Sequence, residues 1–177
     1  MQILGVLTSA EKNAAVAGGV AGGIIGFAAT FSLAMYILYV VALWRIFDKA
    51  GEAGWKSLIP LYNVYILYKI VGMKAWFWML IVVSFVASII VSASGINFAS
   101  MTQEEINNFN LGQYPQVIFA YVFEVIFAFV AQVLFAVRTS RAFGHGAGFA
   151  VGLFFFSPLF MLILGFGKSK YDKKAIK

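Results

Sequence analysis

The stretch Pro115–Val137, PQVIFAYVFEVIFAFVAQVLFAV, decides the fold class of this chain. A transmembrane α-helix needs about 20 consecutive, predominantly apolar residues to cross a hydrocarbon core of roughly 30 Å. The stretch reaches that length, and Glu124 is its one charged residue. Pro115 suits a first helical turn, where its missing N–H leaves no hydrogen bond unmade. The sequence therefore predicts a transmembrane helix over residues 115–137.

The composition of the whole chain agrees with a lipid environment. Of its 177 residues, 62% are hydrophobic and 11% are charged, whereas a soluble domain carries roughly 25% charged residues. The chain has no cysteine, which excludes disulfides, thiolate metal sites and a cysteine nucleophile. The net charge of +6 is interpreted as retention of basic loops on the cytoplasmic side. Nucleic-acid binding is not expected, because the basic residues lie in short patches beside apolar stretches.

Three further apolar stretches complete the prediction, at about residues 14–44, 75–95 and 149–167. The last is interrupted by Pro158, so it either crosses fully or turns back as a re-entrant hairpin. We predict a single membrane domain over residues 1–177. Its fold class is all-α integral membrane, with three to four transmembrane helices plus one proline-broken interfacial or re-entrant segment.

That interfacial or re-entrant segment is predicted at residues 58–71. It is apolar but too short to cross, and segments of 10–14 residues more often lie in the interface or re-enter. It contains Pro60 and Asn63. We expect Asn63 to cap backbone groups around the proline break.

The distribution of Lys and Arg predicts the orientation. The loops after the first and third crossings are basic and are expected in the cytoplasm; their basic residues include Arg45, Lys49, Lys56, Lys69, Lys74, Arg138 and Arg141. The second loop holds Glu104 and Glu105, so that loop and the N-terminus are expected outside an inner (cytoplasmic) membrane. The Lys-rich tail then lies outside if 149–167 crosses, and inside if it is a hairpin.

An internal resemblance between two parts of the chain favours the hairpin. Residues 43–60 and 136–158 each consist of an apolar helix that ends in Arg, a short basic turn, a Gly with an aromatic residue, and an apolar segment broken by Pro. The two parts therefore suggest two halves, each a helix followed by a broken segment.

Five glycines near the start of the first crossing form a candidate helix-packing or partner face. Small residues four apart allow another helix backbone to approach closely. Packing within this chain and docking of another subunit both remain open. The face consists of Gly18, Gly19, Gly22, Gly23 and Gly26.

A candidate intramembrane polar site centres on Glu124. An ionised carboxylate at the centre of a membrane helix costs about 2.5–3.5 kcal/mol on insertion scales, so Glu124 is expected to be protonated, paired or hydrated. Gln132 lies two turns along the same face. A stripe of hydroxyls on the 75–95 helix could face Glu124; its members are Ser84, Ser88 and Ser92. The site is either a proton or cation relay or substrate contact, or a simple interhelical hydrogen bond.

The motifs Gly51-Glu-Ala-Gly-Trp-Lys-Ser-Leu-Ile-Pro-Leu-Tyr-Asn63 and Ala142-Phe-Gly-His-Gly146, with Leu164-Gly-Phe-Gly-Lys-Ser-Lys-Tyr171, carry a family resemblance. They resemble a bacterial multi-pass membrane-protein family of unknown function, some of whose members bear the name signal peptidase I or are fused to one. The resemblance covers about residues 43–78 and 138–171. It implies a multi-pass membrane protein and no activity. Signal peptidase chemistry needs a Ser nucleophile and a Lys base on a soluble β-domain, for which this chain has no segment.

Catalysis finds little support in the sequence. His145 is the single histidine, in a Gly-His-Gly turn, and the aspartates are Asp48 and Asp172. We expect no enzyme activity, no cofactor and no metal site. The function expected is a non-catalytic integral membrane subunit or scaffold of a larger membrane protein complex, with the lipid bilayer and other membrane protein subunits as partners. The alternative is a small transporter or channel that uses Glu124 and a serine-lined path.

Overall fold

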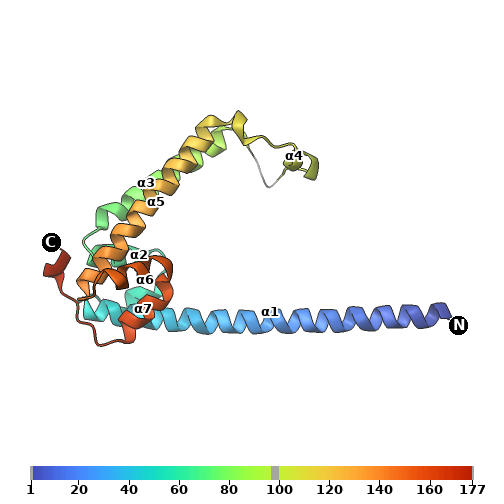
Figure 1. Cartoon of the computed structure of the whole chain (residues 1–177), viewed down its shortest axis with the longest axis horizontal. Helices are drawn as coiled ribbons and strands as arrows, with labels where there is room; N and C mark the ends of the chain where they lie inside the picture. Colours follow the sequence, from blue (N-terminus) through green and yellow to red (C-terminus); the bar gives the residue numbers. More distant parts are fainter. Residues whose placement is uncertain (1, 97–99, 177) are drawn as a thin grey trace. The chain divides into compact units, whose positions relative to one another are not determined.

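The computed structural model describes the backbone of residues 2–96 and 100–176, and their side chains except those of 2–18, 20, 21, 24, 105 and 106. Helices long and apolar enough to span a membrane are Ile25–Lys49 within α1 (Gln2–Lys49), α3 (Lys74–Ala93) and α5 (Pro115–Ala142) (Figure 1). The fold-class prediction is confirmed, because the described part of the chain is all-helical and contains three such spans.

The chain divides into two compact units, residues 1–41 and 42–177. The first unit is the greater part of α1, which begins at Gln2 rather than near residue 14. Alanine, the best helix former, recurs through the early part of this helix and favours helix despite the glycines. Within it, the Thr30 hydroxyl donates to the carbonyl of Gly26, one turn back, at 2.9 Å.

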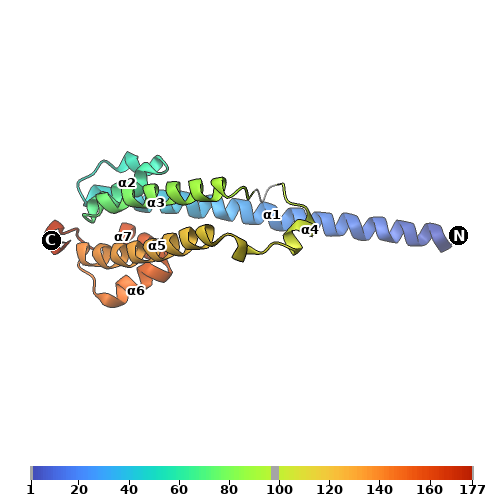
Figure 2. The ribbon, with the colours of Figure 1, turned by 90° about the horizontal axis from the view of Figure 1, so that it is seen from above.

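In the second unit, α3 and α5 lie side by side (Figures 1 and 2). They are connected through α4 (Gln103–Asn107) and the short 3₁₀ helix η2 (Leu111–Gln113). Pro115 lies in the first turn of α5, where the sequence predicted it. The helix continues to Ala142 rather than ending near residue 137, so its last turns carry Arg138 and Arg141. A cation near a helix C-terminus interacts favourably with the helix dipole.

The first proline-broken segment consists of the 3₁₀ helix η1 (Gly54–Leu58) and α2 (Tyr62–Ile70). Between them, Leu61 adopts a left-handed conformation with φ of 65°. Asn63 Nδ2 donates to the carbonyl of Ser57 across this break, at 3.1 Å. The side chain therefore satisfies a backbone group beside the proline, as predicted.

The second proline-broken segment consists of α6 (Ala147–Phe155) and α7 (Ser157–Phe166), which meet at Phe156. The two helices fold back against each other: the rings of Phe149 and Phe160 lie 4.8 Å apart in an edge-to-face arrangement. A Cβ built on Gly152 would meet the Phe160 ring at 2.0 Å, so glycine allows this close approach. With 9 and 10 residues, neither helix reaches the about 20 residues that a crossing needs.

The end of α7 is held at the C-terminal end of α1. Lys49 Nζ donates to the carbonyls of Leu164, at 2.5 Å, and Gly167, at 2.8 Å. Gly165 lies against Ala42, whose Cα would be 2.7 Å from a Cβ at Gly165. The close contact of these two backbones requires glycine at position 165.

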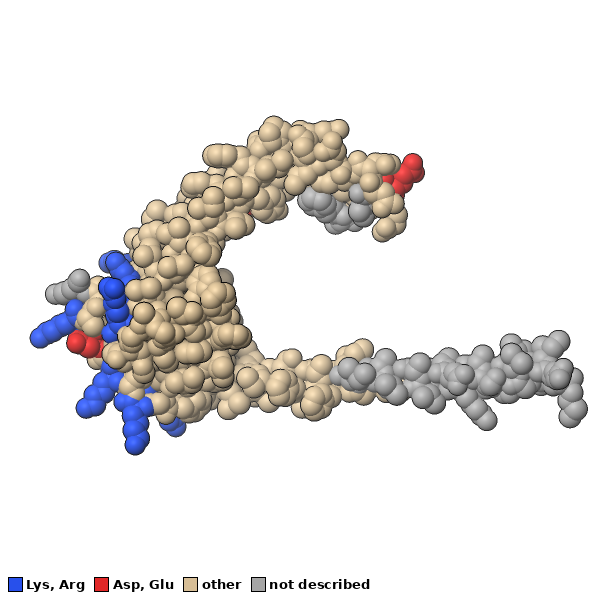
Figure 3. Space-filling view, viewed as in Figure 1, with Lys and Arg blue, Asp and Glu red and all other residues tan. Residues whose placement is uncertain are grey.

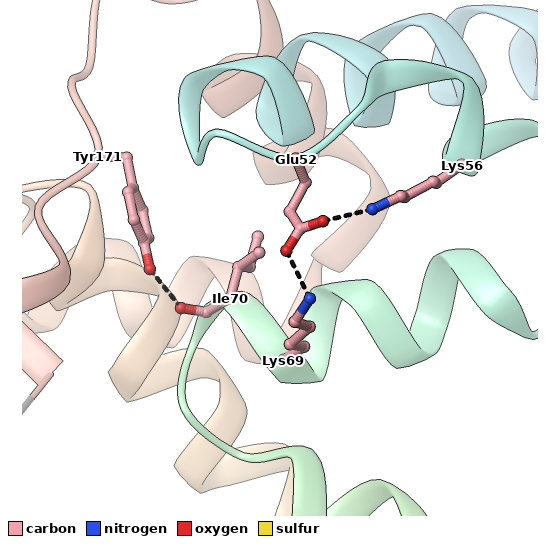
Figure 4. Close-up of polar contacts among 5 residues, drawn as sticks. All are labelled: Glu52, Lys56, Lys69, Ile70 and Tyr171. Atoms are coloured by element: carbon pink, nitrogen blue, oxygen red, sulfur yellow. Dashed lines mark hydrogen bonds and ion pairs between the residues drawn. The ribbon is translucent and has the colours of Figure 1, made fainter.

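The tail after α7 lies at this same end of the unit. The Tyr171 hydroxyl donates to the carbonyl of Ile70 at 2.6 Å (Figure 4), and the Asp172 N–H donates to the carbonyl of Ala142 at 2.7 Å. The α6–α7 segment therefore starts and finishes at one end of the unit, and its geometry is that of a hairpin rather than of a single crossing.

Charges divide the second unit into two ends. Lys and Arg side chains gather, with a few acidic atoms among them, at the end formed by the last turn of α1 and the C-terminal end of α5, while the charged atoms at the opposite end, over α4, are acidic (Figure 3). Between these ends, the face drawn in Figure 3 shows neither sign of charge. This separation is typical of a helical bundle whose middle lies in hydrocarbon.

Candidate functional site

Glu124 and Ser84 meet between the two adjacent spans. Ser84 lies about halfway along α3, and its hydroxyl donates to Oε1 of Glu124 at 2.6 Å. Ser84 is exposed and Glu124 is half-buried. A carboxylate oxygen accepts more than one hydrogen bond, so this contact satisfies part of the capacity of the Glu124 side chain.

A cavity of about 270 Å³ surrounds this hydrogen bond, between α3 and α5. Polar side chains form much of its wall, and it is open to the surface of the unit. The residues that line it are Ser84, Ala87, Ser88, Val91, Ser92, Tyr121 and Glu124. The structure thus brings all three predicted serines to the cavity that contains Glu124. We call this feature the polar cavity.

The individual groups of the polar cavity differ in how far the chain satisfies them. The Ser88 hydroxyl donates to the carbonyl of Phe85 in its own helix, at 2.7 Å. Gln132, the fifth predicted member of the site, is half-buried and does not line the cavity. It lies eight residues from Glu124, about 12 Å along α5. The structure therefore does not bring Gln132 to the carboxylate.

The glycine face is exposed where the structure describes it. A Cβ added at Gly19, Gly22, Gly23 or Gly26 would meet no heavy atom within 4 Å. Gly18 lies outside the residues whose side chains are described. Within the first unit, no described residue packs into these four glycines, and their role as a partner face stays a prediction.

A second polar cluster holds the basic end together. Glu52 lies between two lysines, with Lys56 Nζ 2.5 Å from Oε2 and Lys69 Nζ 2.8 Å from Oε1 (Figure 4). The hydrogen bonds from Lys56 and then Lys69 lower the pKa of Glu52, and the bond to Glu52 raises the pKa of Lys69. The four-residue spacing of Glu52 and Lys56 could have revealed the first pair. Lys69 is on another helix, and no local pattern indicates it.

Within the described residues, no three His, Asp or Glu side chains come together as a group that could hold a metal ion. His145 lies in the turn before α6, and its ring stacks on Phe149 with centroids 4.1 Å apart. The polar cavity contains a carboxyl, three hydroxyls and a phenol, which can exchange hydrogen bonds with a polar group brought from outside the chain.

Together, these features define a multi-pass helical membrane protein with a polar cavity between two of its spans. A model of DUF5684, a family of unknown function, matches residues 104–174, which include α5, α6, α7 and most of the tail. The match includes the second stretch of the resemblance noted in the sequence and not the first, at 43–78. No curated protein and no solved structure matches the chain.

Proposed function

We propose that this protein is a non-catalytic integral membrane subunit or scaffold, and that a transmembrane helix of another subunit covers its polar cavity. One observation carries the proposal: polar side chains on α3 and α5 face outward from the unit well inside its two apolar spans. Another protein helix can form hydrogen bonds with these polar side chains, whereas lipid tails cannot.

The energetics of polar groups in hydrocarbon support a covered cavity. An unsatisfied polar group in the bilayer core costs several kcal/mol, and interhelical hydrogen bonds recover about 0.6 kcal/mol each on average in membrane proteins. Ser84 supplies one hydrogen bond to Glu124. A neighbouring helix with an amide or hydroxyl side chain would supply a donor for the remaining carboxyl capacity and exclude lipid from the cavity.

The glycine face supports the same function from a second surface. Gly22 and Gly26 are one turn apart and exposed, which leaves a flat strip on α1. Small residues at this spacing are enriched where membrane helices approach closely. We propose that the protein lies in an inner (cytoplasmic) membrane, with the basic end facing the cytoplasm. The second loop and the N-terminus then lie outside.

Photo-crosslinking in native membranes tests the proposal. A benzophenone amino acid replaces Tyr121, which lines the polar cavity and is 48% exposed, or Val122, which is 51% exposed and does not line it. Both positions lie at the same depth on α5. We expect a specific adduct of higher mass from position 121 and none from 122. Equal yields at the two positions, or products of monomer mass alone, would contradict a covering subunit.

A small transporter or channel is the second candidate, favoured by the openness of the cavity that reaches Glu124. Water would then enter the cavity. The variants Ser88→Cys and Val122→Cys, in this cysteine-free chain, test that point with a charged, membrane-impermeant thiol reagent. Fast modification of Ser88→Cys alone supports a water-filled path, and protection of both supports the scaffold.

A further inference from the structure

A separate groove runs between α5 and α6, with a volume of about 490 Å³. Its walls are one face of each helix, because the lining positions repeat at intervals of three and four residues. On α5 and the following turn they are Phe129, Val133, Ala136, Val137, Ser140, Arg141, His145 and Gly146; on α6 they are Ala147, Ala150, Val151, Phe154 and Phe155. The groove has an apolar end and a basic end.

The apolar part has the dimensions of a lipid chain. From Phe129 to Arg141 the groove follows α5 for about 18 Å, close to the half-thickness of a roughly 30 Å hydrocarbon core. Aromatic rings close its deep end, where Phe129 and Phe154 meet edge to face at 5.4 Å. Val151 is 57% exposed and Phe155 69% exposed, so the groove is open along its side. A chain can therefore enter laterally from the bilayer.

The basic end of the groove contains Arg141, whose guanidinium differs from those of Arg45 and Arg138 in having no protein partner among the described residues. Arg45 lies over the ring of Phe166 at 5.1 Å, and Arg138 donates to the carbonyl of Gly72 at 3.2 Å. Arg141 is exposed, and within the described residues neither a carboxylate nor a carbonyl accepts from its guanidinium. Arginine binds phosphate through two parallel N–H groups. Arg141 is thus free to bind an anion at the mouth of the groove.

A second group at the mouth lacks a partner. His145 lines the groove, and its Nε2 is buried without a hydrogen-bond partner in the described structure. Buried polar atoms are normally hydrogen-bonded. The Ser140 hydroxyl donates to the carbonyl of Gly146 at 2.8 Å, so its proton is not available to His145. The N-terminus of α6 also opens here, and its dipole favours a negative charge.

We propose that this groove binds an anionic phospholipid, with one acyl chain between α5 and α6 and the phosphate at Arg141 and His145. The amphipathic wall matches such a lipid along its length, because the cation lies at the membrane surface and the aromatic end lies within the hydrocarbon. Binding at this groove does not depend on a subunit at the polar cavity, which is elsewhere on α5.

Native mass spectrometry of the protein in mild detergent tests the proposal, with phosphatidylglycerol and phosphatidylcholine of identical acyl chains as probes. We compare the unaltered chain with Arg141→Gln and with Lys174→Gln, which removes the same charge from the exposed tail. We expect one tightly bound phosphatidylglycerol for the unaltered chain and for Lys174→Gln. Loss of the charged hydrogen bonds in Arg141→Gln should weaken that binding about tenfold or more.

A third variant tests the acyl-chain part of the groove. Val151→Trp places a large ring in the groove at an exposed position and should reduce the binding of both lipids. Excess inorganic phosphate should not displace the lipid, because it lacks the chain. Phosphatidylglycerol binding by Arg141→Gln as tight as that by Lys174→Gln, no effect of Val151→Trp, or displacement by inorganic phosphate would each overturn the proposal.

Discussion

Replacement of Gly165 by alanine probes the contact that holds α7 against the end of α1. The added Cβ would lie 2.7 Å from Cα, Cβ and O of Ala42. Non-bonded carbons pack at about 3.5 Å or more, so the two backbones must separate by about 0.8 Å. Overpacking of this kind costs typically about 1–3 kcal/mol.

Gly148→Ala is the matched control for this substitution. Gly148 lies near the start of α6, as Gly165 lies near the end of α7, and a Cβ there meets nothing within 4 Å. Both variants gain helix propensity, up to about 1 kcal/mol for Gly to Ala. The difference in stability between them therefore isolates the contact with Ala42.

Thermal unfolding in mild detergent measures that difference. A cost of about 1–3 kcal/mol corresponds to roughly 2–12 °C for a chain of this size. We expect Gly165→Ala to unfold below Gly148→Ala by an amount in that range, and Gly148→Ala to unfold at or above the unaltered chain. If the two variants unfold at the same temperature, α7 does not pack on α1 as the structure has it.

Three further predictions concern the polar contacts. Glu52→Gln should destabilise the protein by about 1 kcal/mol at pH 7. The ion pairs with Lys56 and Lys69 lower the pKa of Glu52 in the folded protein. Their stabilisation is therefore fully present above the ordinary glutamate pKa of about 4.3 and is lost as the pH falls through the lower folded-state pKa. Unfolding titrations of both proteins between pH 7 and 3 should converge at the acid end, and a constant gap would refute this. Tyr171→Phe should cost about 1 kcal/mol through its lost bond to the backbone, and unchanged stability would exclude that bond. A double-mutant cycle of Ser84→Ala with Glu124→Leu, which removes the acceptor, should give a coupling of about 0.6 kcal/mol, and additive effects would show that the two side chains do not interact.

Hydropathy identifies the spans because a membrane crossing requires about 20 consecutive apolar residues in one helix, and such a run is visible in the sequence itself. The path of residues 149–167 is different in kind. Its apolar composition suits a crossing and a hairpin equally, and Pro158 shows only where a helix can begin. The contacts that decide the path, Lys49 with Leu164 and Tyr171 with Ile70, join residues far apart in the chain. No local pattern contains them.

The polar cavity follows the same division. Glu124 and the serines could be named in advance, because polar groups are conspicuous in apolar spans. Which serine reaches the carboxyl depends on the relative rotation and depth of α3 and α5, and the side-chain packing that sets these is not periodic. Gln132 shares the helical face of Glu124 and still lies outside the cavity. The groove at Arg141 exists because α5 continues past residue 137 to Ala142. Because Arg138 and Arg141 are basic, they are expected in the loop after the crossing, so the sequence does not indicate this continuation.

Cysteine accessibility tests the central claim, that α6 and α7 return the tail to the basic end of the membrane domain. The chain has no cysteine, so single substitutions Ala53→Cys in the basic loop, Asn108→Cys in the second loop and Lys174→Cys in the tail report on one position each. In intact cells and inverted vesicles, an impermeant thiol reagent should label positions 53 and 174 from one side and position 108 from the other. Labelling of position 174 from the same side as position 108 would contradict the account.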